Sequence, residues 1–109
     1  MIRRIEGDFP LVPRADVARA RIVDVPWLMP GVAAMTLGPV ILLRRDHRGD
    51  DALLAHELVH VRQWRELGAA RFLGRYLGAY VRGRAGGLGH QQAYEAIPLE
   101  VEARELAGR

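Results

Sequence analysis

The first half of the chain carries the apolar patterns of β-strands. Residues 21–25 (Arg-Ile-Val-Asp-Val) alternate weakly between polar and apolar positions, which predicts a short strand. Residues 32–37 and 40–44 predict two more strand segments on either side of Gly38-Pro39. Because proline cannot donate a backbone hydrogen bond, we expect these segments at a sheet edge. Residues 1–20, which are interrupted by prolines, are expected to contribute a short helix near residues 16–21.

The second half has helical spacing and helix-terminating residues. Asp50 or Asp51 can cap a helix from about residue 52 to residue 67, where Gly68 offers an end. Three further helices are expected after it, the last opened by Pro98 at its first position. Their expected ranges are 69–81, 90–96 and 98–107, with a glycine-rich loop over residues 83–89.

A β-rich part followed by a helical part is typical of the α+β class. The 109 residues suit one small domain. We therefore expect a single domain, 1–109, with a short antiparallel sheet within residues 21–45 and a helical part over residues 51–107.

The composition excludes several kinds of chemistry. The sequence has no Cys, Ser or Lys, which rules out serine or cysteine nucleophiles, disulfides, zinc fingers and Schiff-base lysines. An enzyme built from this chain is left with acid–base or metal chemistry through His, Glu, Asp and Tyr.

The charge balance does not single out a partner. All 16 basic residues are arginines, but the formal net charge of +3 is ordinary, so no specific nucleic-acid partner is expected. The arginine-laced helix around Tyr76 and Tyr80 leaves an anionic membrane surface as a less favoured alternative to a solvated face. Without a signal-peptide pattern or a stretch of about 20 apolar residues, we expect a cytoplasmic protein.

The clearest chemical signal is the sequence His56-Glu57-Leu58-Val59-His60. Residues four apart lie one turn apart on a helix, so the two imidazoles point to one place. Zn²⁺ binds imidazole nitrogen readily, and a neighbouring carboxylate can take a proton from metal-bound water. The pattern therefore predicts zinc ligands at His56 and His60 and a general base at Glu57. The alternative is a solvated helix face carrying a His-Glu pair.

A catalytic zinc needs a third protein ligand. Glu100 is the preferred candidate, because it lies one turn into the helix opened by Pro98 and is followed by small residues that allow close helix packing. A surface ion pair with Arg104 is its alternative reading. The other candidates downstream are Glu95, Glu102, Glu105 and His90.

These motifs resemble those of gluzincins, zinc metallopeptidases whose third ligand is a glutamate on a later helix. Glu100-Val101-Glu102-Ala103 is similar to the Glu-x-x-Ala part of the Glu-x-x-Ala-Asp signature of CAAX-prenyl-type and heat-shock-type membrane peptidases, with Arg104 in place of the Asp. The small bacterial minigluzincins are similar in length. The resemblance covers about residues 32–107 and implies a zincin-like fold, with His56, His60 and Glu100 as zinc ligands and Glu57 as general base.

The expected function is peptide-bond hydrolysis by a zinc metallopeptidase acting on a peptide or protein substrate. In the family, an edge strand before the metal-binding helix binds extended peptide, and residues 32–43 occupy that place here. Tyr94 is expected either to pack in the core or to act near the ligand helix. The alternative function is a zinc-binding accessory or scaffold domain without proteolytic activity, because a cleft for a long substrate is hard to build in so small a domain.

Overall fold

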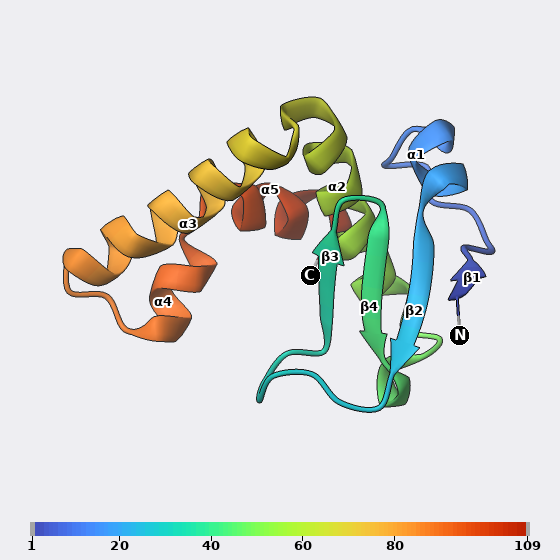
Figure 1. The fold of residues 1–109 in the computed structure, drawn as a ribbon, viewed down its shortest axis with the longest axis horizontal. Coiled ribbons are helices and arrows are strands. Elements are labelled where there is room, and N and C mark those ends of the chain that lie inside the picture. The colour runs from blue at the N-terminus through green and yellow to red at the C-terminus, as the bar shows by residue number, and fades with distance from the viewer. Residues whose placement is uncertain (1, 109) are drawn as a thin grey trace.

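The computed structural model describes residues 2–108 and confirms the α+β class (Figure 1). A four-stranded sheet forms in the N-terminal half, and helices fill the C-terminal half. The strands are β1 (Ile2–Arg4), β2 (Arg21–Val25), β3 (Ala34–Leu37) and β4 (Val40–Arg44). The helices are α1 (Arg14–Arg19), the 3-10 turn η1 (Arg45–His47), α2 (Asp51–Leu67), α3 (Ala69–Ala85), α4 (His90–Glu95) and α5 (Pro98–Ala107).

The sheet has the order β1-β2-β4-β3 and is mixed rather than wholly antiparallel. β1 pairs with β2, and β3 with β4, in antiparallel fashion, whereas the central β2–β4 pair is parallel. The reason is the long connection after β2, which places β3 at the outer edge before the tight turn at Gly38-Pro39 returns the chain as β4 between them. β3 is therefore an edge strand, as the proline in this region predicts, but β4 lies between β2 and β3, so the edge position expected for residues 40–44 is wrong.

The register of the sheet decides which side chains face the helices. Thr36 on β3, Ile41 on β4 and Ile22 on β2 are successive partners across the sheet. Ile22 and Ile41 are completely buried, so all three positions share the inward face. Thr36 is the polar member of this row, and it lies where the edge strand meets α2.

Helix α2 begins directly after its N-terminal capping residue and packs across the inward face of the sheet. The Asp50 side chain accepts a hydrogen bond from the backbone N–H of Leu53 at 3.1 Å, which settles the choice between Asp50 and Asp51 as the cap. α5 lies against α2 and supplies the fully buried Ala103. The core cluster comprises Val12, Ala20, Ile22, Ile41, Leu43, Leu54, Leu58, Val59, Val61 and Ala103.

A single glycine separates α2 from α3. Gly68 ends the first helix and precedes the second, with a backbone φ of 79° that favours glycine. α3 then projects away from the sheet, and α4 folds back beneath it (Figure 1). Phe72 is the one residue of α3 that is fully buried. Within the described residues, none of the helices has the length and apolarity needed to cross a membrane.

Several elements differ from the sequence-based expectation, and α1 spans Arg14–Arg19 rather than residues 16–21. β1 was not expected, because Ile2-Arg3-Arg4 is too polar and too short to show a strand pattern. β3 begins at Ala34, two residues later than predicted. α3 continues to Ala85 through residues expected to form the glycine-rich loop, and Gly83 lies so close to α4 that a Cβ atom there would be 3.2 Å from Ala93 Cβ.

The buried carboxylate of Asp16 ties α1 to the end of α2. It has no exposed surface, and it accepts hydrogen bonds from Arg65 Nε at 2.5 Å and Arg65 Nη2 at 2.9 Å. Arg19 adds a third, at 3.3 Å. The hydrogen bonds from Arg65 hold the pKa of the Asp16 carboxyl below its ordinary value, although burial opposes them.

The substitution Asp16→Asn should destabilise the protein, because charge-assisted hydrogen bonds to a buried group contribute about 1.5–3 kcal/mol. The lowered pKa means that this contribution is complete above the ordinary Asp pKa of about 3.9 and is lost as the pH falls through the folded-state value. Urea unfolding of wild type and Asp16→Asn at several pH values measures both effects. Wild-type stability should decline in acid, and the two proteins should converge there.

Asp46→Asn is the matched control, because Asp46 pairs with Arg44 at the surface with 65% of its side chain exposed. It should unfold like the wild type at neutral pH. Equal stabilities for Asp16→Asn and wild type at neutral pH would contradict the role given to Asp16.

Candidate metal site

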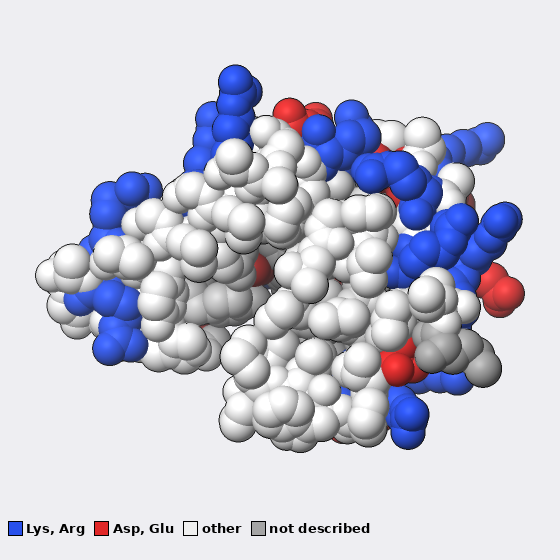
Figure 2. All heavy atoms as spheres, in the orientation of Figure 1, with Lys and Arg blue, Asp and Glu red and all other residues white. Residues whose placement is uncertain are grey.

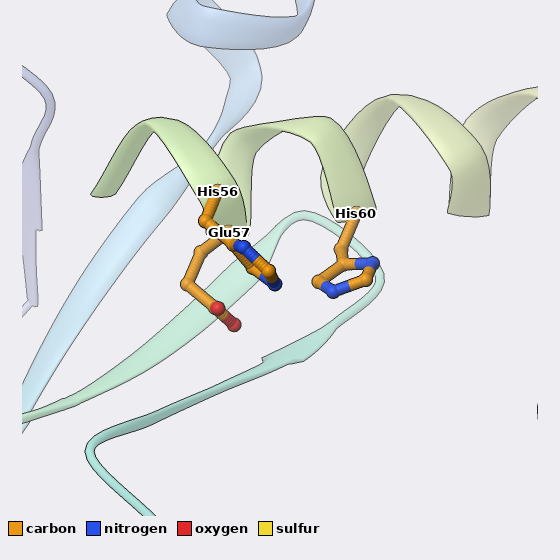
Figure 3. Close-up of side chains that lie close together, drawn as sticks. All are labelled: His56, Glu57 and His60. Carbon is orange, nitrogen blue, oxygen red and sulfur yellow. The ribbon is translucent and has the colours of Figure 1, made fainter. Parts of the chain in front are cut away.

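One turn of α2 brings His56, Glu57 and His60 together on the side that faces away from solvent (Figure 3). All three are buried, and one ligand atom from each lies within 4.8 Å of the others. The two imidazole rings stand edge to face with their centroids 5.0 Å apart. The helical spacing of the motif thus gives the convergence that the sequence predicts, and this group has the donor atoms to hold a metal ion.

The carboxylate of Glu100 comes to the same point from α5. Its Oε1 atom lies 2.8 Å from His56 Nε2 and 3.1 Å from His60 Nε2. Glu100 is 3% exposed, so the expected alternative of a surface ion pair with Arg104 is not what the structure has. Burial opposes ionisation of Glu100, but the two histidines hold the pKa of its carboxyl well below the ordinary value.

His60 Nε2 is the atom that best indicates a missing partner. It is buried, and it makes no hydrogen bond, even though the Glu100 oxygen faces it at 3.1 Å. Two imidazole nitrogens and a carboxylate oxygen are ligands that Zn²⁺ prefers, and tetrahedral zinc ligands lie roughly 3.3 Å apart. The separations of 2.8 and 3.1 Å are close to that spacing, so His56, His60 and Glu100 fit a zinc ion.

Glu57 is held by the sheet rather than by the other helices. Thr36 Oγ1 donates a hydrogen bond to Glu57 Oε1 at 3.0 Å and lies 3.3 Å from the Glu57 backbone oxygen. Burial raises the pKa of the Glu57 carboxyl, and the neighbouring histidines and Thr36 oppose that rise in part. A carboxylate with a raised pKa is suited to accept a proton and release it again near neutral pH.

Two tyrosines border Glu100. Tyr76 on α3 donates a hydrogen bond to Glu100 Oε2 at 2.5 Å, which leaves Oε1 facing the histidines. Burial and the Glu100 charge raise the pKa of Tyr76, so it remains a proton donor. Tyr94 is 36% exposed, and burial together with Glu100 also raises its pKa. Tyr94 therefore lies near the ligand helix rather than wholly in the core.

The other candidate ligands lie elsewhere. Glu95 accepts a hydrogen bond from Gln91 within α4, and His90 Nδ1 is 2.8 Å from the hydroxyl of Tyr80. Glu102 is bound by Arg62 and Gln63 on its outward side, and Glu105 is exposed. Among the acidic residues considered as the third ligand, Glu100 is the one that the structure places against the two imidazoles.

The molecular surface is hollowed between α3 and β3. Figure 2 shows acidic atoms inside the hollow. The surface around the hollow is mostly uncharged, and the arginines lie toward its outer margins (Figure 2).

Sequence reasoning did not find three residues that support the site, Thr36, Tyr76 and Gln63. Thr36 and Tyr76 come from separate elements, and no local pattern links them to the histidines. Gln63 did carry a local signal, since it follows His60 by three residues and so lies on the same helix face.

Residues 28–68 match a family model described as the eCIS core domain, a domain of extracellular contractile injection systems. The matched segment contains β3, β4, α2 and the His-Glu-x-x-His motif, but it covers less than half of the chain and ends before α5 and Glu100. No curated protein and no solved structure matched the chain. The gluzincin resemblance thus stays a prediction that rests on the motifs, while the match to the eCIS core family covers the sheet edge and α2, which carries the candidate metal site.

Proposed function

We propose that the protein is a zinc-dependent metallopeptidase in which His56, His60 and Glu100 hold the ion and Glu57 is the general base. One observation carries the proposal: the buried Glu100 Oε1 atom lies 2.8 Å from His56 Nε2 and 3.1 Å from His60 Nε2. The Glu57 carboxylate lies beside the same histidines and has the separate proposed role of base. A zinc ion bound there would supply Lewis-acid polarisation of a carbonyl and acidify a water molecule.

Two hydroxyl groups of the chain position the proposed base and the proposed carboxylate ligand. Thr36 engages Glu57 Oε1, so the second carboxylate oxygen is the one that takes a proton from the attacking water. Tyr76 engages Glu100 Oε2 and thereby fixes which oxygen faces the histidines. Because Glu57 and Glu100 are each held by a different hydroxyl, the base and the ligand keep separate positions.

The edge of β3 supports an extended peptide as substrate. Within the described residues β3 pairs with β4 alone. The Arg44 N–H donates to the Ala33 oxygen at 2.9 Å, so alternation along the ladder leaves the N–H groups of Ala34 and Thr36 facing away from β4. A peptide added at this edge would pass beside Thr36, whose side chain contacts the general base.

The second candidate function is a zinc-binding domain that serves in a multi-protein assembly without hydrolysing peptides. The match of residues 28–68 to the eCIS core domain favours it, since that domain belongs to injection systems built from many proteins. Both functions place the same ion at the same residues, and they differ in what Glu57 does.

Zinc binding tests both functions at once. Purified protein reconstituted with zinc and dialysed should retain about one ion per chain. Glu100→Gln should weaken binding by more than about 100-fold, because the buried carboxylate is a direct ligand rather than an outer partner. Glu105→Gln, an exposed acid on the same helix, is the control and should bind like the wild type. Metal analysis and competition with a chelating dye provide the measurements. Absence of zinc from the reconstituted wild type would refute both functions.

Glu57→Gln separates the two functions. If Glu57 is the general base, this change should lower hydrolysis of casein or a short-peptide library about 10²–10⁴-fold while zinc content stays the same. Glu66→Gln is the matched control, because Glu66 is an exposed acid on the same helix that pairs with Arg62. A zinc-loaded wild type that cleaves none of these substrates would instead favour the assembly function.

Ala34→Pro tests the edge of β3. Proline removes the outward N–H without disturbing a hydrogen bond to β4, so folding and zinc content should be unchanged. Loss of one main-chain hydrogen bond to the peptide should raise KM about 2- to 10-fold. Ala34→Val keeps the N–H group and is the control for side-chain bulk. Equal KM values for the proline and valine variants would show that peptide does not pair at this edge.

A further inference from the structure

The side-chain amide of Gln63 occupies a fully bonded, buried position behind the metal site. Gln63 is 2% exposed and lies one turn after His60 on α2. Its Oε1 atom is 2.7 Å from His60 Nδ1, while its Nε2 atom donates to the Leu99 carbonyl at 3.0 Å and to Glu102 Oε1 at 2.8 Å. Both partners on α5 are acceptors without a proton to give.

Those acceptors decide which way round the amide lies. A flipped amide would place its oxygen against the Leu99 carbonyl and the Glu102 carboxylate, and it would lose both hydrogen bonds. The oxygen must therefore face His60, and an amide oxygen only accepts. It follows that His60 Nδ1 carries a proton, and that in a neutral ring Nε2 carries the lone pair.

We infer that Gln63 is a positioning residue that holds the proton of the neutral His60 ring on Nδ1, which is the tautomer that leaves Nε2 for a metal ion. The usefulness of that tautomer for binding zinc rests on the proposed function, but the tautomer itself does not. Free imidazoles exchange between two tautomers, and holding one of them in place makes the ligand ready before an ion arrives.

The same amide links His60 to the helix that carries Glu100. Leu99 precedes Glu100 in the chain, so the carbonyl that orients the amide belongs to the backbone next to the ligand. Arg62 binds Glu102 from the other side and keeps that acceptor in place. Gln63 therefore fixes the His60 ring only when α5 is docked on α2. The same docking also brings Glu100 to the histidines, so the tautomer and the position of Glu100 are established together.

Long-range proton–nitrogen NMR on the ¹⁵N-labelled full chain without metal tests the tautomer directly. At alkaline pH, where imidazoles are neutral, the His60 ring should show a protonated Nδ1 and an unprotonated Nε2. The His60 signals are assigned by their loss in His60→Ala. A protonated Nε2, or rapid averaging of the two tautomers, overturns the inference whether or not the protein binds zinc.

Gln63→Met tests the cause of the tautomer, because it keeps the length of the side chain and removes the amide. In this variant the His60 signals should show averaging or the opposite tautomer, and zinc affinity should fall about 10- to 100-fold. Gln91→Met is the matched control, since Gln91 bonds Glu95 on α4, away from the site, and it should leave both readouts unchanged. An unaltered His60 spectrum in folded Gln63→Met contradicts the inference. The fixed tautomer in a wild type that binds no zinc would support the inference while refuting the proposed function.

Discussion

The structure depends on the burial of one negative charge. The Glu100 carboxylate is 3% exposed, and a charge removed from water in this way is costly unless the protein compensates it. His56, His60 and Tyr76 provide that compensation from two other helices, so α2, α3 and α5 have to meet around a single side chain. A divalent ion between the imidazoles and the carboxylate would offset the charge further.

The site has two supports that are independent of each other. The ligand set is held by contacts among helices, through the Tyr76 hydroxyl and the Gln63 amide. Glu57 is held by the sheet, because the register places Thr36 on the inward face next to α2. This division allows the position of Glu57 and the position of Glu100 to be altered separately, and the matched eCIS core segment contains the sheet support but not α5.

The sequence predicts the parts of the site that depend on local geometry. Four-residue spacing on one helix is enough to place His56 beside His60, and Pro98 with the small residues after it is enough to favour Glu100. Thr36 and Tyr76 could not be predicted, because their roles arise from sheet register and from the path of α3. The mixed pairing of the sheet escaped prediction for a similar reason: strand order depends on where the long connection after β2 leads. In contrast, the position of Gln63 beside His60 could have been predicted, because it follows from the same helical spacing that places His56 beside His60.

The glycine between α2 and α3 has a mechanical consequence. Gly68 alone separates the two helices, and its positive φ is a conformation that other residues adopt only with strain. Its torsion angles set the direction of α3 and therefore the position from which Tyr76 reaches Glu100. The direction of α3 and the hydrogen bond from Tyr76 to Glu100 thus depend on the same residue, so a change in the backbone angles of Gly68 would loosen this contact with the buried acid.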